Sequence, residues 1–181
     1  MAEHPMERTL RTALWRQFGA AIAMLENALL VCPSTLWNGL LWSDPEAPAY
    51  PTFWSLTHHT LFWLDLYLTG SLEGFAPPAP FTLDELDPAG VLPEQPYTKE
   101  ELHAYLVHLR KKCQTTIAEL SDEQAHQQVA FPWARGKQVS YLELLLYTIR
   151  RRVWPHAGHP ASRACEARLR PAGRAVPAPT S

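Results

Sequence analysis

Hydrophobic residues recur at helical spacing in four stretches of this sequence. In residues 6–31 they follow one another every three or four positions, from Leu10 through Phe18 to Leu29, which predicts one amphipathic helix. Pro33 ends this helix, because a proline disfavours helical geometry in the residue before it and cannot continue the hydrogen-bond ladder. The first element is therefore expected to be a long helix.

The second stretch, residues 51–70, is hydrophobic almost all the way round a helical axis. Pro51 suits the first turn of a helix, and Gly70 suits a left-handed cap at its end. A helix of this kind would expose large apolar side chains to water if only one of its sides faced a core. We therefore expect burial on two sides, with the partner subunit of a homodimer covering one of them.

Six prolines in residues 71–97 predict a long, stiff and non-helical crossover. Such a crossover allows the helices before and after it to run parallel. Thr98 and Glu101 then have the spacing of a capping box, and hydrophobic positions continue to Leu120. This combination predicts a third helix.

The fourth helix is predicted to start at Ser140 and Glu143, which repeat the capping-box spacing, and its hydrophobic positions continue to Val153. Between the third and fourth helices, Ser121 is expected to cap one or two further helical turns. Residues 131–136 are expected to form a loop. The pattern as a whole predicts an all-α four-helix bundle with one long crossover.

Composition fits a single domain followed by a tail. The chain has 181 residues, of which 46% are hydrophobic and 19% charged, as in a globular protein. Residues 150–181 hold seven arginines and one glutamate, a charge of +6, so the total of −2 leaves −8 for the first 149 residues. An acidic body gives no reason to expect nucleic acid as a partner. We predict a bundle over residues 6–158 and a basic, unstructured tail rich in Pro, Ala and Arg over 159–181.

The three cysteines, Cys32, Cys113 and Cys165, are odd in number and outside any metal-binding spacing. They predict free thiols in a reducing compartment, for which the cytoplasm fits best, and the first two are expected to be small core residues. Residues 27–43 and 47–64 lack charged side chains, but prolines and polar residues interrupt them. We therefore expect no membrane-spanning segment.

Histidines are the main candidates for chemistry, since the sequence has no Gly-rich phosphate loop, nucleophile elbow or Cys-x-x-Cys pair. His59 shares a helical stripe with hydrophobic residues, so its ring should face the interior and need a hydrogen-bond or metal partner there. A core histidine bonded to a backbone carbonyl or a hydroxyl is the alternative. His58 points about 100° away on an ideal helix and is expected at an interface or near the surface. If the last predicted helix continues past Pro155, His156 follows Ile149 and Arg152 along one of its faces and can point across the bundle toward His59.

The other polar candidates have simpler explanations. His103, His108 and His126 lie on a predicted polar face or in a loop, where exposure to solvent is the ordinary outcome. Asp65 is one position off the stripe of His59, and it is either an outer acceptor for that ring or exposed.

Several segments together resemble the DinB/YfiT-like superfamily over about residues 8–158. They are the run Phe53–Leu68, which contains His-His-Thr-Leu-Phe-Trp, the Pro-rich crossover, Phe131-Pro-Trp, and Glu143–Ile149. The resemblance implies a four-helix bundle with an up-down-down-up path. Such proteins are often dimeric and hold a divalent metal ion between three histidines. Characterised members include thiol-dependent transferases and isomerases and metal-dependent hydrolases.

The resemblance also implies which residues would bind the metal. His59 matches the ligand from the second helix, and His156 matches the second histidine of a His-x-x-x-His pair on the last helix. Arg152 stands where the first should be, and an arginine cannot ligate a cation. We therefore expect an incomplete site for Zn or Ni formed by His59 and His156.

The function expected from this resemblance is that of a thiol-dependent S-transferase or a metal-dependent hydrolase. Its partners would be a small-molecule substrate and, for the transferase, a low-molecular-weight thiol. The alternative is a non-catalytic dimeric bundle that binds a small apolar ligand.

Overall fold

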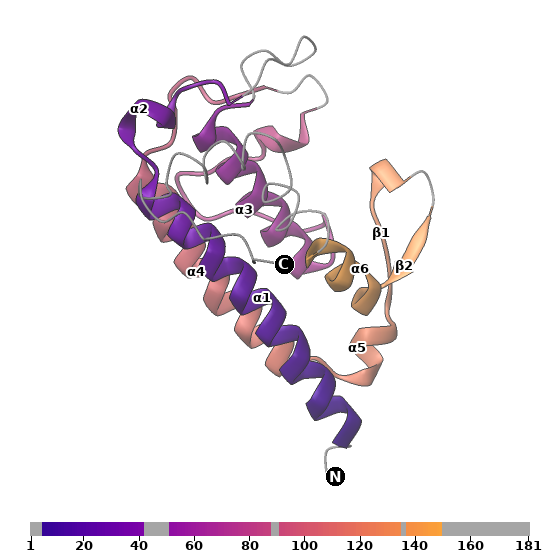
Figure 1. The fold of residues 1–181 in the computed structure, drawn as a ribbon. Helices are drawn as coiled ribbons and strands as arrows, with labels where there is room; N and C mark the ends of the chain where they lie inside the picture. Colours follow the sequence, from indigo (N-terminus) through magenta and orange to yellow (C-terminus); the bar gives the residue numbers. More distant parts are fainter. Residues whose placement is uncertain (1–4, 42–50, 88–90, 135–136, 150–181) are drawn as a thin grey trace, which may run out of the picture.

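The computed structural model describes residues 5–41, 51–87, 91–134 and 137–149. Within these residues the chain is mostly helical, which confirms the predicted all-α class (Figure 1). Val153, Arg152, His156, Cys165 and the predicted boundary between bundle and tail lie outside the described residues. The helices are α1 (Pro5–Val31), α2 (Ser34–Trp37), α3 (Phe53–Thr69), α4 (Lys99–Ala118), α5 (Asp122–His126) and α6 (Tyr141–Thr148), with 3-10 turns η1 (Asp84–Leu86) and η2 (Pro132–Ala134).

Capping residues set the helix ends, but Pro51, which we expected in the first turn of α3, lies before the N-cap residue Thr52 and outside the helix. Thr98 and Glu101 form a reciprocal capping box at the start of α4, and Thr52 with Ser55 forms another at the start of α3. Gly70 ends α3 in the left-handed conformation, with φ of 76°. At the start of α6, only one half of the expected capping box forms, in which the Ser140 hydroxyl accepts a hydrogen bond from the backbone N–H of Glu143.

The long helices α1 and α3 both pack along α4. At one end of the α1 and α4 pair, Arg11 donates to the Leu120 carbonyl oxygen at 2.6 Å. At the other end Lys99 donates to the Cys32 carbonyl oxygen at 2.6 Å, so these two helices are antiparallel. They lie side by side in Figure 1.

The crossover connects parallel helices, as predicted. Near the start of both helices, the Trp54 ring of α3 lies 6.1 Å from the Tyr97 ring, just before α4. Further along, Lys112 of α4 donates to the Thr69 hydroxyl of α3 at 2.7 Å. The chain therefore returns along the bundle between the end of α3 and the start of α4.

The interior of the bundle surrounds α3 on almost every side. Twelve of its 17 residues are buried, which explains its lack of a polar face. The chain itself provides this burial, so the all-round hydrophobic pattern does not require the partner subunit that we expected to cover one side. Hydrophobic residues from α1, α3, α4 and α6 meet in the core and include Phe18, Leu29, Leu61, Leu66, Leu106, Leu109 and Leu145.

A short hairpin precedes α6 and was not predicted. Its strands β1 (Gln128–Ala130) and β2 (Gln138–Ser140) are antiparallel, with Val129 opposite Val139. Part of the expected loop at 131–136 is the turn η2, and residues 135–136 lie outside the described residues. Each strand has only three residues, too few for a recognisable alternation of hydrophobic and polar positions.

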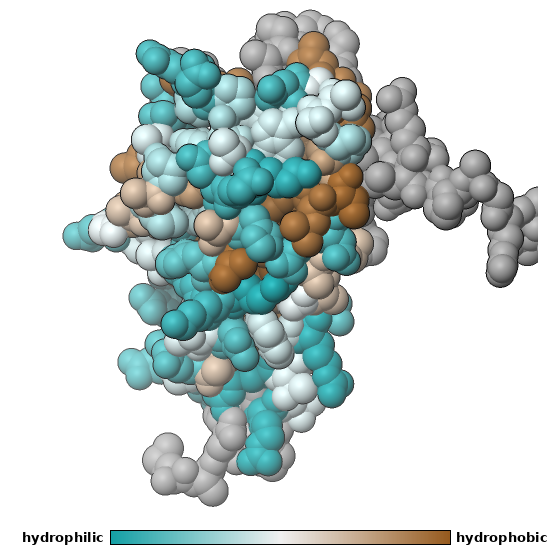
Figure 2. Space-filling model, turned by 90° about the vertical axis from the view of Figure 1, so that its left-hand side faces the viewer, coloured by the Kyte–Doolittle hydropathy of each residue, from teal (hydrophilic) through white to brown (hydrophobic). Residues whose placement is uncertain are grey.

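The surface is largely polar on the face drawn in Figure 2, where hydrophobic areas form separate patches. None of the helices in the described part of the chain is both long and apolar enough to cross a membrane.

Candidate functional site

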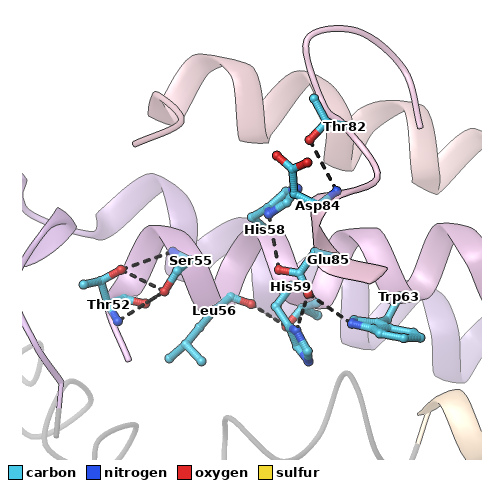
Figure 3. A network of polar contacts seen from close by, with 10 residues as sticks. Thr52, Ser55, Leu56, His58, His59, Trp63, Thr82, Asp84 and Glu85 are labelled. Carbon is cyan, nitrogen blue, oxygen red and sulfur yellow. Dashed lines mark hydrogen bonds and ion pairs between the residues drawn. The ribbon is translucent and has the colours of Figure 1, made fainter. Parts of the chain in front are cut away.

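A buried carboxylate lies at the centre of the candidate site. The turn η1 brings Glu85 from the crossover onto α3, where three side chains point toward it (Figure 3). His59 Nδ1 lies 2.7 Å from Glu85 Oε2, and Trp63 Nε1 donates to the same oxygen at 3.2 Å. His58 Nδ1 lies 3.5 Å from the other oxygen, Oε1. We call His58, His59, Trp63 and Glu85 the Glu85 cluster.

The spacing along α3 explains why one carboxylate meets three side chains. His59 and Trp63 are four residues apart, so they lie on the same side of the helix, one turn from each other. His58 points about 100° away from His59. Glu85 sits between these two directions, with one oxygen turned toward each.

His58 is the more buried of the two histidines, with a side chain only 2% exposed. Its ring stacks on Phe81 with centroids 5.5 Å apart and lies 4.7 Å from the Tyr97 ring. Among the described residues, neither of its ring nitrogens has a hydrogen-bond partner. The expectation that His58 lies at an interface or near the surface is wrong, because the crossover folds over it.

His59 lies at the border between interior and solvent, with 21% of its side chain exposed. Among the described residues, the Glu85 carboxylate meets the expectation that this ring needs a polar partner, whereas the simpler alternative named a backbone carbonyl or a hydroxyl. The sequence offered no sign of this partner. Glu85 is 26 residues away, in a crossover that carries several other acids.

The environment of Glu85 keeps it ionised. Burial raises the pKa of its carboxyl group. The contacts with His58 and His59 lower this pKa by more than burial raises it, so that the pKa is about 2. At neutral pH a buried anion therefore lies beside α3, hydrogen-bonded to the His59 imidazole and the Trp63 indole, with His58 Nδ1 3.5 Å from its other oxygen.

Asp65 belongs to a different contact. Its side chain is buried, and it accepts hydrogen bonds from the Tyr105 hydroxyl at 2.8 Å and from Lys112 at 2.5 Å. Both partners are on α4. Asp65 is therefore buried, contrary to one of the two expectations for it. Its carboxylate is bonded to Tyr105 and Lys112 rather than to His59.

The remaining described histidines follow the prediction of a solvent-accessible position. His108 and His126 are exposed. His103 is partly exposed on α4, where its Nε2 lies 3.1 Å from Glu26, and Arg110 also donates to Glu26 at 2.6 Å. These side chains are not part of the Glu85 cluster.

The two described cysteines are free and buried, as predicted for small core residues. Burial raises the pKa of the Cys113 thiol to about 12, which makes it a poor nucleophile at neutral pH.

The described residues provide one suitable metal ligand. A metal-binding histidine usually has its second ring nitrogen bonded to a carboxylate or a carbonyl, and His59 has such a carboxylate in Glu85. However, residues 5–41, 51–87, 91–134 and 137–149 contain no group of three or more His, Cys, Asp or Glu side chains that could hold a metal ion. His156 and Arg152 lie outside these ranges, so the structure does not test whether His156 meets His59.

Comparison with known protein families gives a match over most of the chain. The profile of the DinB superfamily matches residues 12–150, which run from within α1 to beyond the end of α6. No curated protein and no solved structure matches the chain. The matched segment includes the helix that carries both histidines of the Glu85 cluster and the crossover that carries its carboxylate. The match between the superfamily profile and most of this chain, together with the helical fold, shows that the chain belongs to the DinB superfamily.

Proposed function

We propose that this protein binds a divalent metal ion, Zn or Ni, through His59 and His156. The observation that carries this proposal is the 2.7 Å contact between His59 Nδ1 and Glu85 Oε2. A carboxylate in this place fixes the orientation of a ligating imidazole and increases its basicity. The partial exposure of His59 agrees with a ring that serves a site at the edge of the bundle.

The spacing of residues on the two helices supports His156 as the second ligand. The rings of Tyr67 on α3 and Tyr147 on α6 are 6.3 Å apart. His59 lies eight residues before Tyr67, and His156 lies nine residues after Tyr147. We propose that the helix continues from α6 past Pro155 and antiparallel to α3, which would bring the two histidines to about the same level, since each residue advances a helix by about 1.5 Å.

The reaction we propose is thiol-dependent group transfer or metal-dependent hydrolysis. A bound ion of this kind would supply a nucleophile at neutral pH, by favouring the deprotonated form of a low-molecular-weight thiol or of water. The contribution of the chain is to hold the His59 ring through Glu85. Trp63 in turn donates a hydrogen bond to Glu85 Oε2, and the buried His58 ring lies beside the other oxygen.

Arg152 makes the donor set smaller than usual. A catalytic zinc site normally has three protein ligands. Here the proposed ligands are the imidazoles of His59 and His156, and the third expected position holds the permanently charged Arg152. We therefore expect weaker metal binding than in a three-histidine site.

Metal content tests the proposal. The untagged protein is dialysed against Zn or Ni and then against metal-free buffer, and the metal per chain is measured by elemental analysis. We expect bound metal in the wild type, and its loss in His59→Ala and in His156→Ala. His103→Ala is the matched control, because it also removes a histidine paired with a glutamate, and it should leave the metal content unchanged.

Two results would contradict the proposal. One is a wild-type protein that retains no metal, which would favour the non-catalytic bundle that binds a small apolar ligand. The other is a His59→Ala protein that retains as much metal as the wild type.

We further propose a homodimer in the cytoplasm. Free, buried cysteines suit a reducing compartment. Trp133 and Leu146, which are both exposed, offer apolar surface to a second copy of the chain. Light scattering should give twice the chain mass of 20.5 kDa, and a monomer at micromolar concentration would contradict the dimer.

A further inference from the structure

We propose that Glu85 is a positioning residue that holds neutral His59 in the tautomer with hydrogen on Nδ1, so that Nε2 carries the lone pair that binds metal. The metal part of this inference rests on the proposed function. The choice of tautomer rests on the geometry of the Glu85 cluster alone.

The direction of the hydrogen bond follows from the chemistry of its two atoms. An ionised carboxylate has lone pairs and no hydrogen, so it can only accept. Glu85 Oε2 lies 2.7 Å from Nδ1 of His59, which must therefore be the donor. In neutral imidazole only one nitrogen carries hydrogen, so Nε2 is left with the lone pair.

The acceptor is fixed in place before any metal binds. The Trp63 indole N–H donates to the same oxygen at 3.2 Å, and His58 Nδ1 lies 3.5 Å from the other oxygen. The carboxylate is itself buried, with a side chain 6% exposed. Rotation of Glu85 away from His59 would give up these contacts in a place where water cannot easily replace them.

A second pair in the same protein provides an internal contrast. His103 also faces a glutamate, but it uses its other nitrogen, with Nε2 lying 3.1 Å from Glu26 Oε1. The same reasoning assigns the hydrogen of neutral His103 to Nε2. The two histidines should therefore differ in tautomer within one sample.

Long-range ¹H–¹⁵N correlation spectra of the metal-free, full-length protein test this assignment. At a pH where the imidazoles are neutral, such spectra report which ring nitrogen carries hydrogen. We expect the Nδ1–H pattern for His59 and the Nε2–H pattern for His103, with each signal assigned by its loss in the corresponding His→Ala variant. An Nε2–H pattern for His59 in the wild type would overturn the inference, and this measurement requires no variant of Glu85.

Two variants then test whether Glu85 is the cause. The amide of Glu85→Gln can either accept or donate, so a population with hydrogen on Nε2 should appear at His59. Trp63→Phe is the control, because it removes the indole N–H from the same oxygen and leaves the carboxylate, and it should keep the His59 tautomer. An unchanged tautomer in a folded Glu85→Gln protein would show that Glu85 does not set it.

Metal affinity separates this inference from the proposed function. Replacing a carboxylate that supports a metal-bound histidine typically weakens metal binding about 10- to 100-fold, and we expect a loss of this size in Glu85→Gln. If the wild type shows the expected tautomer but binds neither Zn nor Ni, the proposed function is wrong and the assignment of the His59 tautomer stands. If the wild type binds metal and Glu85→Gln binds it equally well, the role of Glu85 in metal binding is wrong.

Discussion

Lys112 of α4 is held against Asp65 of α3, with its ammonium group 2.5 Å from Asp65 Oδ1 and 3.2 Å from the backbone oxygen of the same residue. The carboxylate is buried, whereas the lysine remains partly exposed. The contact therefore joins two parallel helices through a charge that has been largely removed from water.

Removing the positive partner should destabilise the fold. In Lys112→Met the Asp65 carboxylate stays buried and loses its compensating charge, which typically costs about 3 kcal/mol. Urea unfolding should show this loss as a lower midpoint. Lys111→Met is the control, since that neighbour is exposed, and it should change the unfolding free energy by less than about 0.5 kcal/mol. Equal effects of the two substitutions would show that the pair contributes no stability.

The low pKa of Glu85 predicts a loss of stability in acid. The pKa of its carboxyl group is about 2 in the folded protein and close to 4.5 in an unfolded chain. Its stabilising contribution is fully present above about pH 4.5 and is lost as the pH falls toward 2, and it amounts to about 3 kcal/mol. Glu85→Gln should reduce the difference in unfolding free energy between pH 7 and pH 3. The exposed Glu73→Gln in the same crossover should leave that difference unchanged.

The left-handed cap of α3 offers a second test of stability. An alanine Cβ at Gly70 would lie 3.1 Å from Tyr141 Cε2, at a backbone φ of +76°. Gly70→Ala should therefore cost about 2 kcal/mol or more, through backbone strain and the close contact. Gly74 has a φ of +72° but nothing within 4 Å of such a Cβ, so Gly74→Ala should cost only about 1 kcal/mol. Thermal or urea unfolding that ranked the two variants equally would contradict the role of Tyr141.

The buried thiols should resist alkylation. In a Cys165→Ser background, Cys32 and Cys113 are the remaining cysteines, and both are buried. Iodoacetamide at pH 8 should leave the native protein unmodified over hours and add two groups after unfolding in urea. Mass spectrometry measures the difference. Fast labelling of the native protein at Cys113 would contradict its burial and its raised pKa.

The helices of this fold could be predicted because their signals are local. Thr98 and Ser140 cap helices that start where the sequence indicates, and Gly70 ends α3 as expected. The prolines between α3 and α4 indicated a long crossover, which allows the parallel course that these helices have. The hairpin β1–β2 was missed because three-residue strands carry too little pattern.

The candidate site was predicted only in part. His59 was identified, but α3 is hydrophobic almost all the way round, so its periodicity could not show which of two adjacent histidines is more deeply buried. That difference depends on Phe81 and Tyr97, which reach His58 from the crossover and its end. Glu85 could not be predicted as the partner of His59, because only the three-dimensional path of the crossover brings the two side chains together.

The path of the crossover has a consequence for how this protein can change over evolution. Connecting segments usually tolerate insertions and deletions, but the stretch between Gly70 and Glu85 also sets where the acid reaches α3. Lengthening or shortening this stretch would shift the Glu85 carboxylate relative to the His59 ring, whose place on α3 would stay the same. The length of this crossover is thus tied to the contact between Glu85 and His59.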